Sequence, residues 1–317
     1  MSDNNIKELI LKNRPKLALG SYNTYMSSYR SMKKNSKIPM DTPEEIIKNY
    51  KQIIDYLMET SPMVRKSKLS CFIVIIDDKK SDDKDLAIAL EAFRKQMYMD
   101  ADTVKDKELE QDLTDKQKEN LIPQEEVLKI YNQLRDEATP LLKLEKLNRR
   151  QFTLLTKYIL LSLYVLISPR RSLDYTYFKI RNFDTTEKST DNYMLKGNTK
   201  KDPSYFIFNT YKTAKRMGRQ AIEIPKTLEK LIDSWLKFND TDYLLVNSVD
   251  KQITGSKIAL WLNEIFGRNI SSNMLRHIYL TDKYSAINLK EITETAREMG
   301  QSDISRTLKY VQKNEEE

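Results

Sequence analysis

The sequence predicts a mainly α (α+β) protein: an N-terminal helical bundle, followed by a mostly helical domain that carries a small antiparallel β-sheet. Three observations lead to this fold class. Apolar residues recur at the helical period of about 3.6 residues along much of the chain. The 317 residues include only 6 glycines and 9 prolines, which argues against a repeat-rich β or collagen-like architecture. Short β-rich segments around turns appear from residue 180 onward.

Residues 1–105 are predicted to form the helical bundle, with about four helices. The stretch GSYNTYMSSYRSMKK places aromatic and apolar side chains at helical spacing. In the next stretch, TPEEIIKNYKQIIDYLMET, Thr42 is the expected N-cap, Pro43 takes the first helical position and Glu45 completes a capping box. Two more helices are expected, over residues 61–76 and 84–99.

A second domain is predicted over residues 123–317, because the chain is long enough for two cores. The charged segment 106–122, poor in large apolar residues, is predicted to be a linker with room for partial helix. Three segments predict a three-stranded insert in the second domain: NYMLKG, YFIFNTYKT and QAIEIP. Helices are expected over residues 124–138, 148–165, 227–236, 256–266, 272–284, 290–299 and 302–310.

The chain has one cysteine, Cys71, and one histidine, His277. A single cysteine excludes a disulfide framework within the chain, and the apolar run CFIVII predicts that this thiol is buried and inert. The same counts exclude a zinc site built from cysteine and histidine, while a carboxylate-only magnesium site stays open. We expect no cofactor. On a helix, His277 points about 100° away from its neighbour Arg276, so we expect it to pack or to buttress.

Membrane insertion and secretion are not expected. No run approaches the roughly 18 apolar residues of a membrane span. Residues 1–14 lack the apolar core of a signal peptide. We therefore expect an intracellular protein.

The charge is basic overall and unevenly distributed. The net charge is +8, residues 1–70 carry 13 Lys/Arg against 7 Asp/Glu, and residues 71–120 carry 9 against 14. Two basic regions separated by an acidic one suit a protein that binds a polyanion at two places. The solvated surface of a lysine-rich protein explains the same counts, so charge alone leaves both interpretations open.

The chain has no P-loop, no GxGxxG and no nucleophile elbow, but it has a series of cations that ends in a tyrosine. The cations are the paired Arg170 and Arg171, Lys212 at an expected β-turn and Arg276 in an apolar helix; Tyr310 follows. A tyrosine hydroxyl can attack a DNA phosphodiester and form a covalent phosphotyrosine. Guanidiniums can bind the non-bridging oxygens, and a lysine can protonate the leaving 5′-oxygen. Singly, each residue is equally well explained as structural.

The series resembles the tyrosine recombinase (phage-integrase-type) family over about residues 19–312. In RSLDYTYFKIRNFD, Arg171 is followed three residues later by Asp174 and then by an apolar pair, as in the family's first-arginine box. Arg170 fits this spacing less well. We therefore choose Arg171 as the first catalytic arginine and expect Arg170 to contribute mainly to DNA binding.

The other motifs of the family are matched in order along the chain. YKTAKR is similar to the segment with the β-turn lysine, MLRHIYLT to the second-arginine box and MGQSDISRTLKYV to the box that precedes the nucleophile by nine residues. The resemblance implies five catalytic residues: Arg171, Lys212, Arg276, Gln301 and Tyr310. Asn273 and Gln301 replace residues that are usually His or Lys and His or Trp in the family. Both amides can donate a hydrogen bond, but neither can transfer a proton near neutral pH.

The resemblance implies a site-specific DNA recombinase or integrase. Such an enzyme cleaves and rejoins duplex DNA through a covalent 3′-phosphotyrosine, without a metal, and works as a homotetramer on paired DNA sites. The N-terminal bundle resembles the family's core-binding domain, which forms one half of a clamp around double-stranded DNA. The segments SPRRSLDY and NTYKTAKRMG favour an integrase of a virus or mobile element, acting in the host nucleus or cytoplasm.

Two other functions remain open. A type IB DNA topoisomerase uses the same Arg-Lys-Arg-Tyr chemistry but relaxes supercoils as a monomer. A catalytically weakened DNA-binding relative is favoured by Asn273 and Gln301. Assays for supercoil relaxation, for recombination between two sites and for a covalent DNA adduct separate the three.

Overall fold

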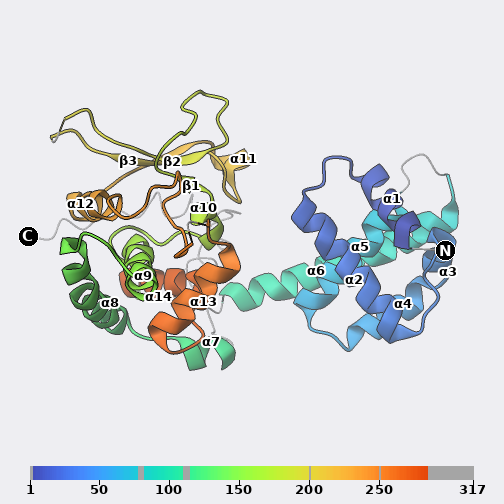
Figure 1. The fold of residues 1–317 in the computed structure, drawn as a ribbon. Helices are drawn as coiled ribbons and strands as arrows, with labels where there is room; N and C mark the ends of the chain where they lie inside the picture. The colour runs from blue at the N-terminus through green and yellow to red at the C-terminus, as the bar shows by residue number, and fades with distance from the viewer. Residues whose placement is uncertain (1–2, 78–81, 110–114, 200, 250, 285–317) are drawn as a thin grey trace, which may run out of the picture. The chain divides into compact units, whose positions relative to one another are not determined.

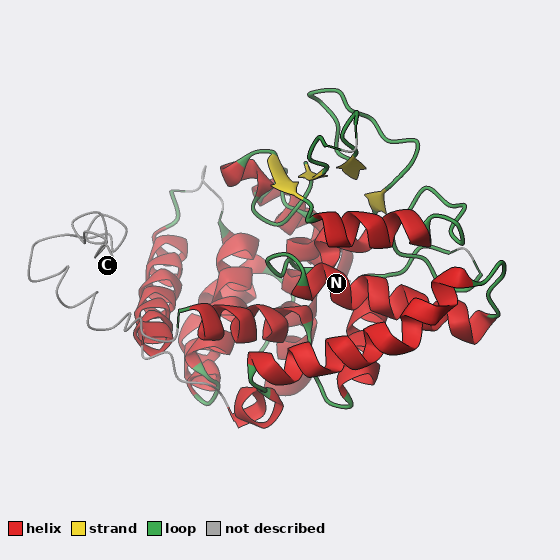
Figure 2. Ribbon diagram, turned by 90° about the vertical axis from the view of Figure 1, so that its left-hand side faces the viewer, coloured by secondary structure: helices red, strands yellow, loops and turns green. Residues whose placement is uncertain are grey.

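The computed structural model describes residues 3–77, 82–109, 115–199, 201–249 and 251–284. These residues are mainly helical with one small β-sheet, which confirms the fold class (Figures 1 and 2). They divide into two compact units, one within residues 1–112 and the other within residues 113–287, and each has its own hydrophobic core. The segments expected to be helical over 290–299 and 302–310 lie outside the described residues.

The described part of the first unit contains six helices. α5 is the central one, because it contacts each of the other five, and the apolar run from Cys71 to Ile76 is buried in it. The expected bundle is therefore present, with two more helices than predicted. The six are α1 (Asp3–Asn13), α2 (Leu19–Ser36), α3 (Pro43–Lys48), α4 (Tyr50–Met58), α5 (Pro62–Ile76) and α6 (Lys84–Leu109).

The prediction of one helix after Thr42 is wrong in one respect, since the chain breaks at Asn49 into α3 and α4. The Asn49 side chain donates a hydrogen bond to the carbonyl of Pro39 (3.0 Å), and its backbone leaves the helical region at φ −99° and ψ 14°. The N-cap is as predicted: Thr42 Oγ1 accepts from the Glu45 amide at 3.2 Å. The Glu45 carboxylate, however, accepts from the Asp41 amide, one residue before the position that a capping box requires.

The first unit contains a buried ion pair and a buried thiol. Arg65 and Asp100 form an ion pair between α5 and α6 in which Nη2 and Oδ1 are 2.6 Å apart. Cys71 is fully buried, as predicted, and its thiol lies 3.2 Å from the carbonyl of Tyr25. Burial raises the pKa of the Cys71 thiol to about 12, so the thiolate is not populated at neutral pH.

The second unit is built around α9, which contacts α8, α12 and α13 and is buried along most of its length. Asn148 is the N-cap of α9 and forms a capping box with Gln151, and asparagine is a favoured N-cap residue. The predicted helices end within about a residue of those observed. The predicted ones are α8 (Gln124–Ala138), α9 (Arg149–Val165), α12 (Lys226–Trp235), α13 (Gly255–Phe266) and α14 (Ser272–Lys283). The structure adds the short helices α10 (Ser172–Thr176) and α11 (Ala214–Met217), which were not predicted, and α7 (Asp115–Asn120) lies in the segment predicted to be a partly helical linker.

The sheet has four strands in the order β1-β2-β3-β4, all gathered on one side of the second unit (Figures 1 and 2). β2 (Asn192–Leu195), β3 (Tyr205–Phe208) and β4 (Gln220–Glu223) pair antiparallel and are the three predicted strands. The extra strand, β1 (Phe178–Lys179), pairs parallel to β2, so the sheet is mixed rather than purely antiparallel. Two residues are too few to show an alternating pattern, and β1 is held instead by burial of Phe178 against the rings of Phe206 and Phe208.

Arg181 stabilises the loop after α12. Its guanidinium donates to the carbonyls of Asn239 (2.7 Å), Thr241 (2.6 Å) and Leu236 (3.3 Å). We expect Arg181→Met to lower the free energy of unfolding by about 2 kcal/mol, because three carbonyls lose a charged donor. Urea denaturation measures the change. Arg135→Met is the control, because within the described residues this arginine pairs only with its exposed neighbour Asp136. A loss above about 0.5 kcal/mol in Arg135→Met would contradict the expected difference between the two variants.

Candidate active site: an arginine cluster in the second unit

A pair of serines joins the starts of α10 and α14. Ser272 Oγ accepts from the amide of Ser172 at 3.3 Å, and the two hydroxyls are 3.1 Å apart, although the residues are 100 positions apart in sequence. Arg171 is the N-cap of α10, and Arg276 lies in the second turn of α14. The serine contact therefore brings the two segments with the predicted catalytic arginines together.

Arg171 and Arg276 are close enough for their charges to act on each other. Partial burial lowers the pKa of Arg276 and the charge of Arg171 lowers it further, while Asp174 acts in the opposite direction. Within the described part of the chain, the Arg171 guanidinium makes no hydrogen bond or ion pair. Arg276 has only a long contact of 3.5 Å to Asn273 Oδ1 there. Two half-buried guanidiniums with unused donors form a setting that an anion with several oxygens would fit.

Asp174 is the carboxylate of the cluster, and it pairs with Arg170 rather than with Arg171. Arg170 Nε donates to Asp174 Oδ2 at 2.9 Å, and the two side chains are 13% and 4% exposed. Burial raises the pKa of the Asp174 carboxyl, and the nearby guanidiniums of Arg170, Arg171 and Arg276 oppose that rise. The acid of the predicted first-arginine box is thus bound by the arginine that fitted the box less well.

Arg170 is bound by the protein through two of its three side-chain nitrogens. Besides Asp174, it binds Gln220 through Nη1 (2.8 Å to Oε1), and its guanidinium carbon lies 3.8 Å from the centre of the Phe208 ring and 5.1 Å from that of Tyr211. Its donors point to partners within the second unit, so the expectation that it serves mainly in DNA binding does not fit its surroundings.

Lys212 is exposed in the connection between β3 and β4. The prediction of a turn is correct at this residue, but the connection is longer than a tight hairpin because it contains α11. The hydroxyl of Tyr211 closes the connection by donating to the carbonyl of Gly218 at 2.6 Å. Gly218 has φ +70°, a value that favours glycine.

The remaining residues singled out from the sequence do not join the arginine cluster in the described part of the chain. Gln301 and Tyr310 lie outside the described residues. His277 is exposed, so the prediction that it packs is wrong. Sequence reasoning did not find the two serines that join the helices, nor Asn192, whose side chain binds the carbonyls of Asp174 (3.0 Å) and Thr210 (2.8 Å). No pattern in the sequence marks these polar residues, because their partners are distant along the chain.

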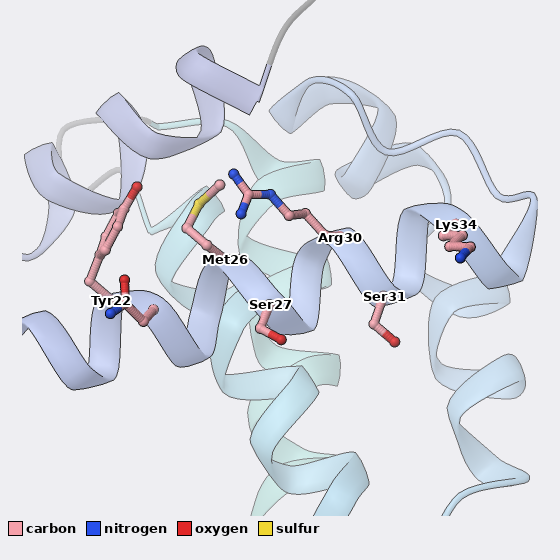
Figure 3. A pocket seen from close by; sticks show the side chains of 7 residues that line it. Tyr22, Met26, Ser27, Arg30, Ser31 and Lys34 are labelled. Carbon is pink, nitrogen blue, oxygen red and sulfur yellow. The ribbon is translucent and has the colours of Figure 1, made fainter. Parts of the chain in front are cut away.

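The first unit has a basic pocket of about 600 Å³ along one face of α2 (Figure 3). Tyr22, Met26 and Arg30 extend from the same side of the helix in this view. Seven side chains of mixed polarity line it: Tyr22, Asn23, Met26, Ser27, Arg30, Ser31 and Lys34. The pocket belongs to the basic N-terminal region of the sequence.

Neither a metal site nor a membrane-spanning helix is found in the described residues, and two comparisons with known proteins found no match. Within residues 3–284, apart from the gaps, no three His, Cys, Asp or Glu side chains gather so that they could hold a metal ion. No helix in that part of the chain is long and apolar enough to cross a lipid bilayer. A scan of protein-family models gave no match. A search of curated proteins gave no match either.

Proposed function

We propose that this protein is a DNA strand-transferring enzyme of the tyrosine recombinase type, which cleaves and rejoins duplex DNA through a covalent 3′-phosphotyrosine. The observation that carries the proposal is the convergence of Arg171 and Arg276, two guanidiniums with unused donors at the junction of α10 and α14. A phosphodiester is an anion with two non-bridging oxygens, and each of them can accept from one of the two guanidiniums.

Each residue has one chemical task in this proposal. The hydroxyl oxygen of Tyr310 forms a bond to phosphorus while the bond from phosphorus to the 5′-oxygen breaks. The phenol proton leaves to water, and Lys212 gives a proton to the departing 5′-oxygen. Arg171 and Arg276 bind the non-bridging oxygens as negative charge develops, and Gln301 adds a neutral hydrogen bond. The reverse steps rejoin the strand, because the phosphotyrosine conserves the bond energy.

The partner in this proposal is double-stranded DNA, held in part by residues 1–70 of the first unit, which carry 13 Lys/Arg against 7 Asp/Glu. The α2 pocket, with Arg30 and Lys34 among its lining side chains, supports a polyanion partner. As a recombinase the protein assembles as a homotetramer on paired sites, and as an integrase it serves a virus or mobile element inside a cell. No metal takes part, since the fixed cations provide the positive charge.

A covalent-trapping experiment tests the proposal. The protein is incubated with random-sequence duplexes, quenched with sodium dodecyl sulfate, and the DNA that remains attached to protein is sequenced. We expect an adduct with a consensus sequence at its 3′ end and no loss of adduct in excess chelator, because side chains supply the charge. Absence of any adduct across the library, together with intact DNA binding, would favour the weakened DNA-binding relative.

The type IB topoisomerase is the second candidate, because the arginine cluster serves its chemistry equally well. Placing the trapped sequence once on a supercoiled plasmid tests relaxation, and placing it twice tests exchange. A recombinase yields deletion or inversion products from the two-site plasmid. Efficient relaxation of plasmids with one site, without exchange on those with two, would favour the topoisomerase.

A further inference from the structure

Arg170 contacts both ends of the connection that carries Lys212. Phe208, whose ring lies under the guanidinium, is the last residue of β3. Gln220, which accepts a hydrogen bond from Nη1 at 2.8 Å, is the first residue of β4. The Tyr211 ring, 5.1 Å from the guanidinium carbon, belongs to the residue just before Lys212. One side chain therefore fixes the base of the connection on both sides.

Other side chains also fix the two ends of the connection from outside. At its far end, Arg219 Nη2 donates to the hydroxyl of Tyr193 at 3.0 Å. Asn192 Oδ1 accepts from the amides of Asn209 and Thr210, both at 2.9 Å, which holds the start of the connection only. The bond from Tyr211 to Gly218 is internal to the connection and does not place it relative to the arginine cluster. Asn192 also donates to the carbonyl of Asp174, but it reaches only the start of the connection. Arg170 differs because it binds Asp174, on the helix that Arg171 caps, and contacts both ends of the connection, at Phe208 and Gln220.

We propose that Arg170 is a positioning residue, which sets the place of Lys212 relative to Arg171 and Arg276. The inference rests on the proposed function in so far as Lys212 is the proton donor. Proton transfer requires the ammonium group within hydrogen-bond distance of the leaving oxygen, and a displacement of about 1 Å can cost about 10²-fold in rate. Lys212 is exposed, so the conformation of the connection rather than burial of the lysine determines where its ammonium group lies.

Hydrogen exchange tests whether Arg170 holds the connection in place, and the measurement does not depend on enzyme activity. In Arg170→Met, amides of residues 209–219 should exchange about tenfold faster, while amides in α8 and α9 keep their protection. Arg181→Met is the matched control, because it removes a similarly engaged arginine from a different loop and should leave residues 209–219 unchanged. Gln220→Met removes only the contact to β4 and should give a smaller increase. If the amides of residues 209–219 exchange at the parental rate in Arg170→Met, Arg170 does not hold the connection in place.

Leaving-group chemistry tests the link to Lys212. DNA with sulfur in place of the bridging 5′-oxygen releases a thiolate, which needs no proton because thiols are far more acidic than alcohols. We expect Arg170→Met to cleave ordinary DNA about 10²-fold slower and sulfur-containing DNA within about threefold of the parental rate. Arg171→Ala should be slow on both substrates. Equal slowing of Arg170→Met on both would overturn the positioning role. If the parental protein forms no adduct at all, the proposed function fails, and the exchange measurement still decides whether Arg170 braces the connection.

Discussion

Tyr310→Phe is expected to abolish the covalent protein–DNA adduct while DNA binding stays within about twofold of parental. The substitution keeps the aromatic ring and removes only the oxygen that would bond to phosphorus. Phosphate contacts, which dominate the affinity of proteins for DNA, come from other side chains and are unchanged. The adduct is measured on the trapped sequence by denaturing gel, and binding is measured by fluorescence anisotropy at the same salt concentration.

Tyr279→Phe is the matched control for the nucleophile. Tyr279 lies on α14 one turn after Arg276, its hydroxyl is 3.2 Å from Ser168 Oγ, and a hydrogen bond with Ser168 lowers its pKa. It is therefore the tyrosine beside the cluster that could compete with Tyr310. We expect Tyr279→Phe to form adduct at close to the parental rate. Loss of the adduct in Tyr279→Phe, with retention in Tyr310→Phe, would reassign the nucleophile to α14.

Arg171→Ala and Arg276→Ala are each expected to slow adduct formation by about 10²–10³, comparable to the removal of one donor from an oxyanion hole. The effect should fall on the rate of the chemical step more than on affinity, because the charge on the phosphate oxygens increases in the transition state. Single-turnover kinetics at saturating protein separates the two. Since both side chains bind one phosphate, the double variant should lose less than the product of the single losses.

His277→Ala serves as the control for the arginine variants. His277 is the exposed neighbour of Arg276 on the same helix, and we expect its removal to change the rate by less than about threefold. Parental rates in both arginine variants would show that the cluster is a structural feature of the junction between α10 and α14. The adduct would then depend on other cations.

The sequence predicted the elements whose pattern is local and failed where distant residues decide. In α8 and α9 the helical pattern of apolar residues continues over 15 and 17 residues, and Pro123 and Asn148 mark where the helices begin, so their bounds were predictable. The break at Asn49 depends on the carbonyl of Pro39, which no helical pattern reveals. β1 is two residues long and exists because Phe178 is buried against β3.

The sequence indicated the arginines of the candidate site but not all of their contacts. The convergence of Arg171 with Arg276 was expected from the resemblance, and the structure brings their segments together through Ser172 and Ser272. The partner of Asp174 was not foreseen, because spacing along the chain cannot tell whether an acid pairs three residues back or four. The contact between Arg170 and Gln220 was not foreseen either, because Gln220 is 50 residues away along the chain.

The burial of Cys71 has a practical consequence for measuring the distance between the two units. The sequence has no other cysteine, and a thiol with a pKa of about 12 inside a packed bundle does not react with maleimides at neutral pH. Cysteines introduced at exposed positions outside the α2 pocket and the arginine cluster, such as Lys48→Cys in α3 and Lys230→Cys in α12, would therefore take fluorescent dyes or spin labels without background. The distance between the two labels, measured with and without duplex DNA, would report directly whether the units close around it.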